Sequence, residues 1–335
     1  MSIHASLNKQ FYKKSTWIFL LIPFSIVFWL LITLRKFLYR INIFKIYELQ
    51  VPLVIVGNIT IGGTGKTPLI IFLAQKLAEK KLNVGIISRG YKSKKNYPRE
   101  VTNNSDYLEV GDEPLLIKKN LNIPVFVGKN RVQTAKKLLE EYEKIDVILS
   151  DDGLQNYALH RDFELAVVDG DRYFGNNFLL PAGPLREPVS RLENVDAVVV
   201  NGEKNKITKY KTMTCHYSNI IFNIHNLGKK TLKSLVGSDI IVMTAIGNPD
   251  RLLNYLRTLK LQFKSITFND HHHFQQNDFK AYKNNLILMT EKDAIKCESI
   301  EHNNIWYLPI NVRIDEKIIN NMLKKLKLKY GSKLT

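Results

Sequence analysis

Asn58-Ile59-Thr60-Ile61-Gly62-Gly63-Thr64-Gly65-Lys66-Thr67-Pro68 is the stretch of sequence that decides the fold. The apolar run Val51–Val56 before it is typical of a buried strand, and Pro68–Lys80 after it has apolar side chains at helical spacing. A glycine-rich loop between a strand and a helix lets backbone N–H groups approach phosphates closely. The positive N-terminal end of the helix adds to this attraction. The stretch therefore predicts nucleotide binding in an α/β fold.

The side chains of this loop suit the phosphates of ATP. Lys66 would reach the outer phosphates, and the Thr67 hydroxyl would bind Mg²⁺. The loop departs once from the pattern G-x-x-x-x-G-K-[ST], because Thr60 stands at the first glycine position. We expect eight residues to hold the nucleotide: Thr60, Ile61, Gly62, Gly63, Thr64, Gly65, Lys66 and Thr67.

Short apolar runs and helical patterns alternate along the rest of the chain. Strands are predicted at Val84–Ile87, Pro124–Val127, Val147–Leu149, Leu165–Val168, Ala197–Val200, Ile240–Ala245, Leu286–Met289 and Ile305–Leu308. Helices are predicted at Arg131–Tyr142, Pro249–Leu259 and, basic and amphipathic, near Glu316–Leu328. This alternation predicts a parallel sheet with flanking helices, as in P-loop NTPases. Because the rhythm stops over 203–235, we predict a P-loop core at 46–205, a junction at 206–236 and a smaller C-terminal α/β domain at 237–335.

The N-terminal segment 1–45 is predicted to hold a membrane-anchoring helix. Ser15–Leu34 is a run without a charged side chain, and as a helix it would be about 30 Å long, enough to cross a hydrocarbon core. Nothing like a signal-peptide cleavage site follows it. Pro23 leaves open a kinked helix in one leaflet, and a buried core helix is the alternative. Basic and aromatic residues typical of membrane interfaces stand near both ends of the run: Lys13, Lys14, Trp17, Trp29, Arg35, Lys36, Tyr39 and Arg40.

Composition narrows the class of protein and of partner. The 335 residues allow two domains, and 45% hydrophobic with 24% charged residues excludes a wholly disordered chain, a collagen-like fibre and a many-span membrane protein. Lys and Arg number 49 against 31 Asp and Glu, a net charge of +18 that suits an anionic partner or simply a lysine-rich solvated surface. The two cysteines, Cys215 and Cys297, are too few for a disulfide framework and indicate reduced thiols in a cytosolic body.

Three further groups of residues are chemical candidates. Asp151 and Asp152 follow an apolar strand, where P-loop enzymes hold Mg²⁺. Two others are Gly111-Asp112-Glu113-Pro114 and Phe268-Asn269-Asp270-His271-His272-His273-Phe274. Three adjacent histidines diverge on any regular element, so a zinc site is not expected. One histidine paired with a distant aspartate could instead take a proton from a hydroxyl.

Together these segments resemble the tetraacyldisaccharide 4'-kinase (lipid A 4'-kinase) family of Gram-negative bacteria. The resemblance runs from about residue 15 to 310, and the run PAGPLREP (181–188), together with DHH (270–272) and TEKD (290–293), is far more specific than the phosphate loop alone. Asn156 and Asn269 depart from the family's usual residues. The motifs are, in order, GNITIGGTGKTP (57–68), SRGY (88–91), GDEP (111–114), DDGLQ (151–155), LLPAGPLREP (179–188), AIGNP (245–249), FNDHHHF (268–274) and MTEKDAIK (289–296).

The resemblance implies an activity and a set of roles. The ATP γ-phosphate would pass to the 4'-hydroxyl of a tetraacylated glucosamine disaccharide 1-phosphate, giving a 4'-phosphorylated lipid A precursor. Asp112, partnered by His271, would help deprotonate that hydroxyl. Arg186 would act near the phosphates with Lys66. The implied Mg²⁺ site consists of Thr67, Asp151, Asp152 and Glu187.

The anchor and the basic excess suit an anionic glycolipid substrate, and no nucleic acid is expected. Because ATP is cytosolic, we expect the catalytic body on the cytosolic face of the inner (cytoplasmic) membrane. A membrane-anchored P-loop ATPase of the partitioning or targeting type is the alternative, although that group has a lysine directly before the paired glycines, where this chain has Ile61.

Overall fold

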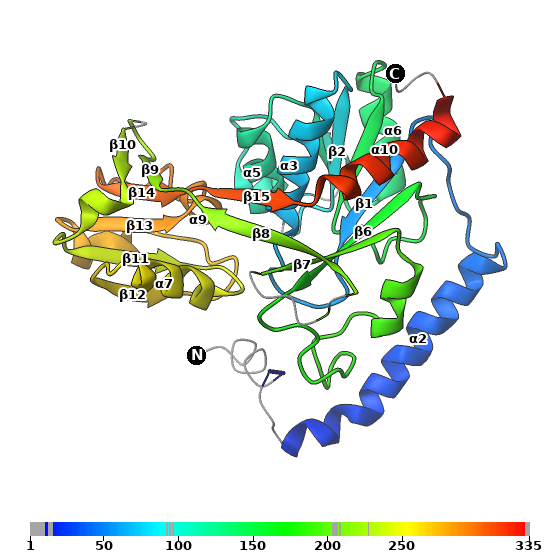
Figure 1. The fold of residues 1–335 in the computed structure, drawn as a ribbon, viewed down its shortest axis with the longest axis horizontal. Helices are drawn as coiled ribbons and strands as arrows, with labels where there is room; N and C mark the ends of the chain where they lie inside the picture. Colours follow the sequence, from blue (N-terminus) through cyan, green and yellow to red (C-terminus); the bar gives the residue numbers. More distant parts are fainter. Residues whose placement is uncertain are drawn as a thin grey trace.

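The computed structural model describes residues 11–12, 16–91, 93, 95, 97–202, 207, 209–226 and 228–331, with only the backbone of residues 16 and 17. Lys13, Lys14 and Ser15 of the predicted anchor therefore lie outside the described residues, as do 1–10, 203–206 and 332–335. The described chain forms two units, each built around its own sheet (Figure 1). The predicted α/β class is confirmed.

The larger unit contains a nine-stranded sheet in the order β15-β8-β7-β6-β1-β5-β2-β4-β3 among the described residues. Strands β8 to β4 of this order run parallel, and β15 and β3 pair antiparallel at the two edges. The strands are β1 (Leu53–Gly57), β2 (Val84–Ser88), β3 (Arg99–Glu100), β4 (Val125–Val127), β5 (Val147–Asp151), β6 (Phe163–Asp169), β7 (Ala197–Asn201), β8 (Lys211–Tyr217) and β15 (Ile310–Ile314).

Helices cover both faces of this sheet, which is why its central strands are buried along their whole length and mostly apolar. One face packs against α3 (Lys66–Glu79), α5 (Asp112–Asn120) and α10 (Glu316–Tyr330). The other packs against α6 (Arg131–Glu141) and the 3₁₀ turn η2 (Val189–Asn194). The short α4 (Tyr107–Val110) leads directly into α5.

The smaller unit contains a six-stranded sheet in the order β10-β9-β14-β13-β11-β12. Four of its strands are parallel, and β9 and β10 add an antiparallel edge. Its elements are β9 (Ile220–Asn223), β10 (Lys229–Thr231), η3 (Leu232–Leu235), β11 (Ile240–Thr244), α7 (Pro249–Thr258), β12 (Phe263–Thr267), α8 (Gln276–Phe279), η4 (Lys280–Tyr282), β13 (Leu286–Thr290), α9 (Glu291–Ala294) and β14 (Ile305–Leu308).

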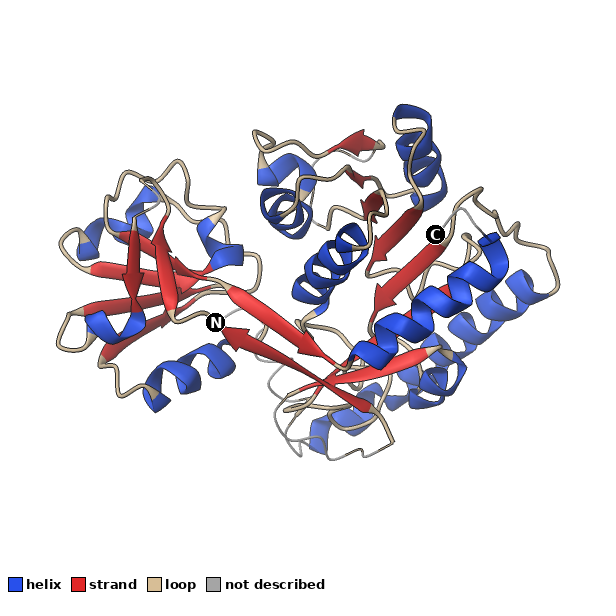
Figure 2. Cartoon of the chain, turned by 45° about the horizontal axis from the view of Figure 1, so that its top comes forward, coloured by secondary structure: helices blue, strands red, loops and turns tan. Residues whose placement is uncertain are grey.

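The two units do not follow the predicted domain boundaries. The predicted junction 206–236 contains β8 of the larger sheet as well as β9 and β10 of the smaller one. The predicted C-terminal domain 237–335 ends with β15 and α10, which belong to the larger unit. The chain returns because β15 pairs with β8 and because α10 buries five apolar side chains on the larger sheet: Ile318, Ile319, Met322, Leu323 and Leu326. Both connections between the units are therefore adjacent strands (Figure 2).

The apolar N-terminal segment is a helix on the outside of the larger unit. It consists of η1 (Thr16–Leu21) and α2 (Ile22–Arg40), and Figure 1 shows α2 running along the edge of the molecule. Over Ile18–Arg40 it is long and apolar enough to cross a membrane, with mean hydropathy 2.3 and 11% of its most apolar window buried. This exposure excludes the buried core helix. Pro23 lies in the first turn of α2, where its missing N–H is tolerated.

Candidate active site

A cleft of about 3250 Å³ lies between the two units. The phosphate loop, the end of β5 and α5 line it from the larger unit, and the loop after β12 lines it from the smaller one. Of the predicted site residues, all but Thr60 and Asp112 are among its lining residues. Thr60 is buried and bridged to Leu185. The fold thus gathers the motifs, although they are up to about 200 residues apart in sequence.

The phosphate loop has the open backbone that a bound phosphate needs. Gly62 and Gly65 adopt φ values of +93° and +95°, which side chains with a Cβ rarely accept. At Gly63 an added Cβ would meet nothing within 4 Å, so the backbone there faces open space. The Asn201 amide of β7 donates to the Thr64 carbonyl at 3.0 Å and supports the loop. The Thr64 hydroxyl is buried and has no hydrogen-bond partner among the described residues, which is expected of a donor that binds an anionic ligand.

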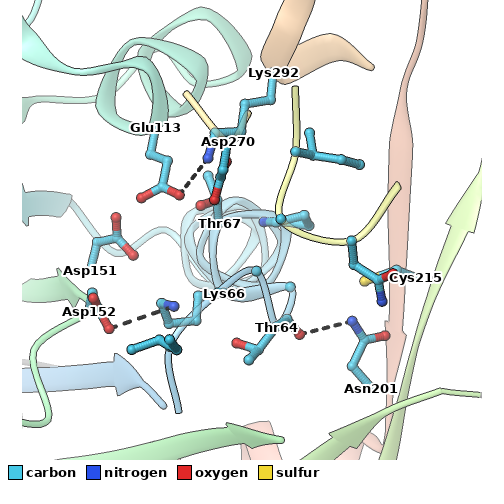
Figure 3. A pocket seen from close by; sticks show the side chains of 18 of the residues that line it. Thr64, Lys66, Thr67, Glu113, Asp151, Asp152, Asn201, Cys215, Asp270 and Lys292 are labelled. Atoms are coloured by element: carbon cyan, nitrogen blue, oxygen red, sulfur yellow. Dashed lines mark hydrogen bonds and ion pairs between the residues drawn. The ribbon is translucent and has the colours of Figure 1, made fainter. Parts of the chain in front are cut away.

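Two acidic side chains stand beside this loop because β5 is the direct neighbour of β1. Asp151 pairs in register with Val56 at the end of the two strands. Burial, together with the nearby carboxylates of Glu113 and Asp152, raises the pKa of Asp151 to about 7. Figure 3 shows Glu113, Asp151 and Asp152 on one side of the phosphate-loop helix, with Lys66 reaching toward Asp152.

Asp152 is an ionised carboxylate held by two cations. Arg186 Nη1 lies 2.7 Å from its Oδ2, and Lys66 Nζ lies 3.6 Å from its Oδ1. Burial opposes ionisation, but these two cations outweigh it and hold the pKa of Asp152 well below its usual range. Lys66, Asp152 and Arg186 therefore form one charged group at the phosphate loop.

The acidic pair fits a divalent cation. Among the described residues, Oδ1 of Asp151 and Oδ1 of Asp152 are buried without a hydrogen-bond partner, and the second has only the Lys66 ammonium beside it, at 3.6 Å. Buried carboxylate oxygens are costly unless a further group binds them. Hard oxygen donors are what Mg²⁺ prefers, and Thr67 offers a hydroxyl at the start of α3. The described residues contain no group of three or more His, Cys, Asp or Glu side chains that would bind a metal by themselves, so phosphate oxygens would have to complete the site.

Glu187 does not fit the predicted Mg²⁺ site. Its carboxylate is buried and accepts hydrogen bonds from Gln155 Nε2 at 2.9 Å and from the Tyr157 hydroxyl at 2.6 Å. Lys36 of α2 and Arg191 form ion pairs with the same carboxylate. A carboxylate that already has donors on both oxygens and two cations beside it is a poor metal ligand. Sequence alone could not show this, because the partners come from three separate elements.

Asp112 and His271, 159 residues apart, are hydrogen-bonded: His271 Nδ1 lies 2.7 Å from Asp112 Oδ2. Asp112 begins α5 and is 5% exposed. Its burial opposes ionisation, but Lys292 and His271 lower the pKa of Asp112 well below its usual range. An ionised carboxylate only accepts hydrogen bonds, so Nδ1 of the imidazole carries the hydrogen and Nε2 is left able to take a proton.

The structure also separates the three neighbouring histidines. His272 bonds to Asp278 at 3.0 Å and stacks on Phe268, and His273 contacts the Tyr107 hydroxyl. Among the three, only His271 is a lining residue of the cleft. Its backbone has a φ of 62°, which turns the chain sharply at this point.

Two cations of the site were missed in the sequence. Arg172 follows β6, is held by Asp169, and donates to the carbonyls of Gly63 at 2.6 Å and Gly247 at 3.1 Å, so it joins the phosphate loop to the smaller unit. Lys292 of α9 pairs with Glu113 at 2.8 Å, and this ion pair joins the units at a second place (Figure 3). A charged residue just after an apolar strand was the available signal for Arg172.

Comparison with known proteins decides the family. The family described as tetraacyldisaccharide-1-P 4'-kinase matches residues 17–327. This chain belongs to that family. Its relatives include the tetraacyldisaccharide 4'-kinases of Methylobacillus flagellatus, 43% identical over 96% of this chain and 95% of the relative, and of Haemophilus influenzae, 43% identical over 91% of each. The predicted family resemblance is confirmed.

A solved structure of the family has the same fold. LpxK from Aquifex aeolicus, determined in complex with ATP, matches with a TM-score of 0.78 and 28% identity over 92% of this chain and 99% of that one. The family match does not favour the alternative of a partitioning or targeting ATPase.

Proposed function

We propose that this protein is an ATP-dependent lipid kinase that phosphorylates the 4'-hydroxyl of a tetraacylated glucosamine disaccharide 1-phosphate in lipid A biosynthesis. The observation that carries the proposal is one cleft with a phosphate loop on one side and a buried Asp–His pair on the other. The first binds the donor and the second takes a proton from the acceptor. Family membership supplies the acceptor's identity.

The phosphate loop binds and orients ATP. Backbone N–H groups around Gly63 and the N-terminus of α3 receive the phosphate oxygens, and Lys66 neutralises charge on the outer phosphates. Arg186 shares Asp152 with Lys66 and would stabilise the charge that spreads over the transferred group. Asp151, Asp152 and Thr67 would hold Mg²⁺, which supplies further charge neutralisation on the phosphates.

Asp112 and His271 act on the acceptor hydroxyl. The carboxylate orients the imidazole and stabilises its protonated form, and the pair accepts the proton as the sugar oxygen attacks the γ-phosphorus. Lys292 keeps Asp112 ionised at neutral pH. Asp112 belongs to the larger unit and His271 to the smaller one. The site is therefore complete only when the two units are close enough for these side chains to form their hydrogen bond.

The helix α2 brings this site to a lipid surface. Its outward side chains are large, apolar and exposed, which suits contact with acyl chains. Its inward side is tied to the protein body at Ser25 and at Lys36, about 16 Å apart along a helix axis. If the helix crossed the bilayer, backbone polar groups of the body that lie against it between these two contacts would have to enter the hydrocarbon core. We therefore expect the helix to lie in one leaflet of the inner membrane, with the body on the cytosolic side.

A phosphate-transfer assay tests the proposed function. The full chain is incubated in detergent with γ-labelled ATP, Mg²⁺ and the acylated disaccharide 1-phosphate, and the label is followed into the lipid phase. We expect labelled lipid that depends on acceptor and enzyme. ATP hydrolysis without transfer to any glycolipid would contradict the proposal and would favour an ATPase.

A further inference from the structure

We propose that Ser25 and Lys36 of α2 are positioning residues for phosphate transfer: they hold the loop of residues 179–187, called here the support loop, which carries Arg186 into the site. The inference rests on the proposed kinase function. It assigns the membrane-facing helix a second role, because the same helix that would bind lipid also fixes the backbone beside the transferred phosphate.

Ser25 is a buried polar residue in the otherwise apolar first part of α2, residues 22–32. It is 5% exposed, whereas the large apolar side chains around it face outward. Its hydroxyl donates to the Leu179 carbonyl at 2.8 Å and accepts from the Ala182 backbone N–H at 3.0 Å. One side chain therefore satisfies two backbone groups of the support loop. A hydroxyl in that place indicates a specific contact with the protein body, because lipid contact alone would require none.

Lys36 holds the other end of the support loop. Eleven residues after Ser25 on the same helix, it forms an ion pair with Glu187, whose side chain is 1% exposed. Glu187 in turn accepts from Gln155 Nε2, which also donates, at 3.0 Å, to the carbonyl of Asn58 next to the phosphate loop. The carboxylate that sequence analysis assigned to Mg²⁺ is thus a link between α2 and the phosphate loop.

The second half of the support loop forms two backbone hydrogen bonds with the segment that begins the phosphate loop. The Arg186 N–H donates to the Ile59 carbonyl at 2.7 Å, and the Ile61 N–H donates to the Pro184 carbonyl at 2.9 Å. Arg186 then reaches Asp152 at 2.7 Å. An unbroken series of hydrogen bonds and ion pairs thus runs from the lipid-facing helix to the group that contacts the phosphates.

The expected effect is on the rate of transfer and not on nucleotide binding. Without Ser25 the Ala182 N–H loses a buried partner, and without Lys36 the buried Glu187 carboxylate loses one of its two cations, so the support loop relaxes. A displacement of Arg186 by about 1 Å is enough to slow a positioned reaction by up to about 100-fold. ATP is held by the phosphate loop itself, so its KM should change little.

Two variants and two matched controls test the inference. Ser25→Ala and Lys36→Met should each lower kcat about tenfold, with the KM for ATP within about twofold of the wild type. As controls, Thr33→Ala removes a hydroxyl and Arg40→Met removes a cationic group, both at exposed positions of α2. These two variants should keep the wild-type kcat. Lys36→Arg should restore most of the rate. Cosedimentation with vesicles of phosphatidylethanolamine and phosphatidylglycerol should be the same for Lys36→Met and Arg40→Met.

A measurement without substrate separates this inference from the proposed function. In Ser25→Ala, hydrogen exchange at the amides of Ala182 and Arg186 should be at least about tenfold faster than in Thr33→Ala, even if no lipid acceptor is ever found. Equal exchange, or equal kcat in Ser25→Ala and its control, would overturn the positioning role. A loss of kcat that exactly follows a loss of vesicle binding would overturn it too, since α2 would then act only as an anchor.

Discussion

At the scale of single residues, the Lys66 ammonium is expected to have different partners in the site without ATP and in the site with ATP bound. In this structure it pairs with Asp152 at 3.6 Å, and with ATP bound it would turn to the phosphates. We predict that Lys66→Ala lowers kcat on the order of 10²–10⁴-fold, because charge stabilisation in the transition state is lost. Steady-state transfer assays measure this. Lys76→Ala, on the exposed side of the same helix, is the control and should keep its rate.

Asp112 and His271 are predicted to act as one unit. Either Asp112→Ala or His271→Ala should lower kcat by about 10²–10⁴-fold, with a smaller effect on the KM for ATP. Because the two side chains share one hydrogen bond, the double variant should be little slower than the worse single variant. His272→Ala is the matched control, since that ring bonds to Asp278 instead. Losses that multiply in the double variant would show two independent roles.

The residue types of the site could be predicted from sequence, but their partners could not. A glycine-rich loop with Lys66, and acidic residues after a strand, follow local rules that need no fold. The partner of Asp112 lies 159 residues away, and the choice among three adjacent histidines depends on a backbone turn at His271. The contacts of Glu187 argue against its predicted role as a metal ligand for the same reason, because a carboxylate's role depends on the cations that the fold brings to it.

At the scale of elements, the ends of β11 and β13 are joined by the buried carboxylate of Asp293, which accepts hydrogen bonds from both. Asp293 accepts from the Ala245 N–H and from the hydroxyls of Thr244 and Thr290, and its other oxygen lies 2.7 Å from Lys296 Nζ. Both side chains of the ion pair are at most 1% exposed. Asp293 therefore supports the smaller unit from within.

We predict that Asp293→Ala destabilises the smaller unit by about 3–5 kcal/mol, since it leaves a buried lysine and several donors without a partner. Urea unfolding followed by the fluorescence of the buried Trp306 would measure it. Glu298→Ala removes a carboxylate that is 52% exposed and should cost no more than about 1 kcal/mol. Equal unfolding midpoints for the two variants would contradict this role of Asp293.

The parallel strands were predictable as elements, whereas the strands that join the two units were not. Central strands such as β1 and β5 are buried at every position, so they are apolar apart from Ser150 and Asp151 at the end of β5. β8 and β15 alternate between buried and exposed positions and contain lysine, threonine and arginine. Such patterns are weak, and no local pattern shows that β15 crosses back to a strand almost 100 residues earlier. The predicted boundaries failed at this crossing.

At the scale of the whole molecule, the larger unit, the smaller unit and α2 surround the cleft and contribute to it in different ways. The larger unit binds the nucleotide, the smaller unit contributes His271, and α2 extends along the outside of the larger unit (Figure 1). The basic excess of the chain is consistent with an anionic lipid acceptor at the same surface. If α2 binds a membrane as proposed, its position would therefore determine which way the cleft faces relative to that surface.

Removal of residues 1–40 tests this arrangement as a whole. The nucleotide fold should persist, because the cores of the two sheets contain no residue of α2. Vesicle binding should be lost, and transfer to acceptor in vesicles should fall far more than the affinity for ATP, measured by calorimetry.

If the shortened protein still sedimented with vesicles, a second membrane surface would be required. The basic helix α10 offers lysines for such a surface, but its apolar face is already buried on the larger sheet. Its attraction to anionic lipid would therefore be purely electrostatic and would disappear in about 0.5 M salt, whereas binding through the apolar face of α2 would persist.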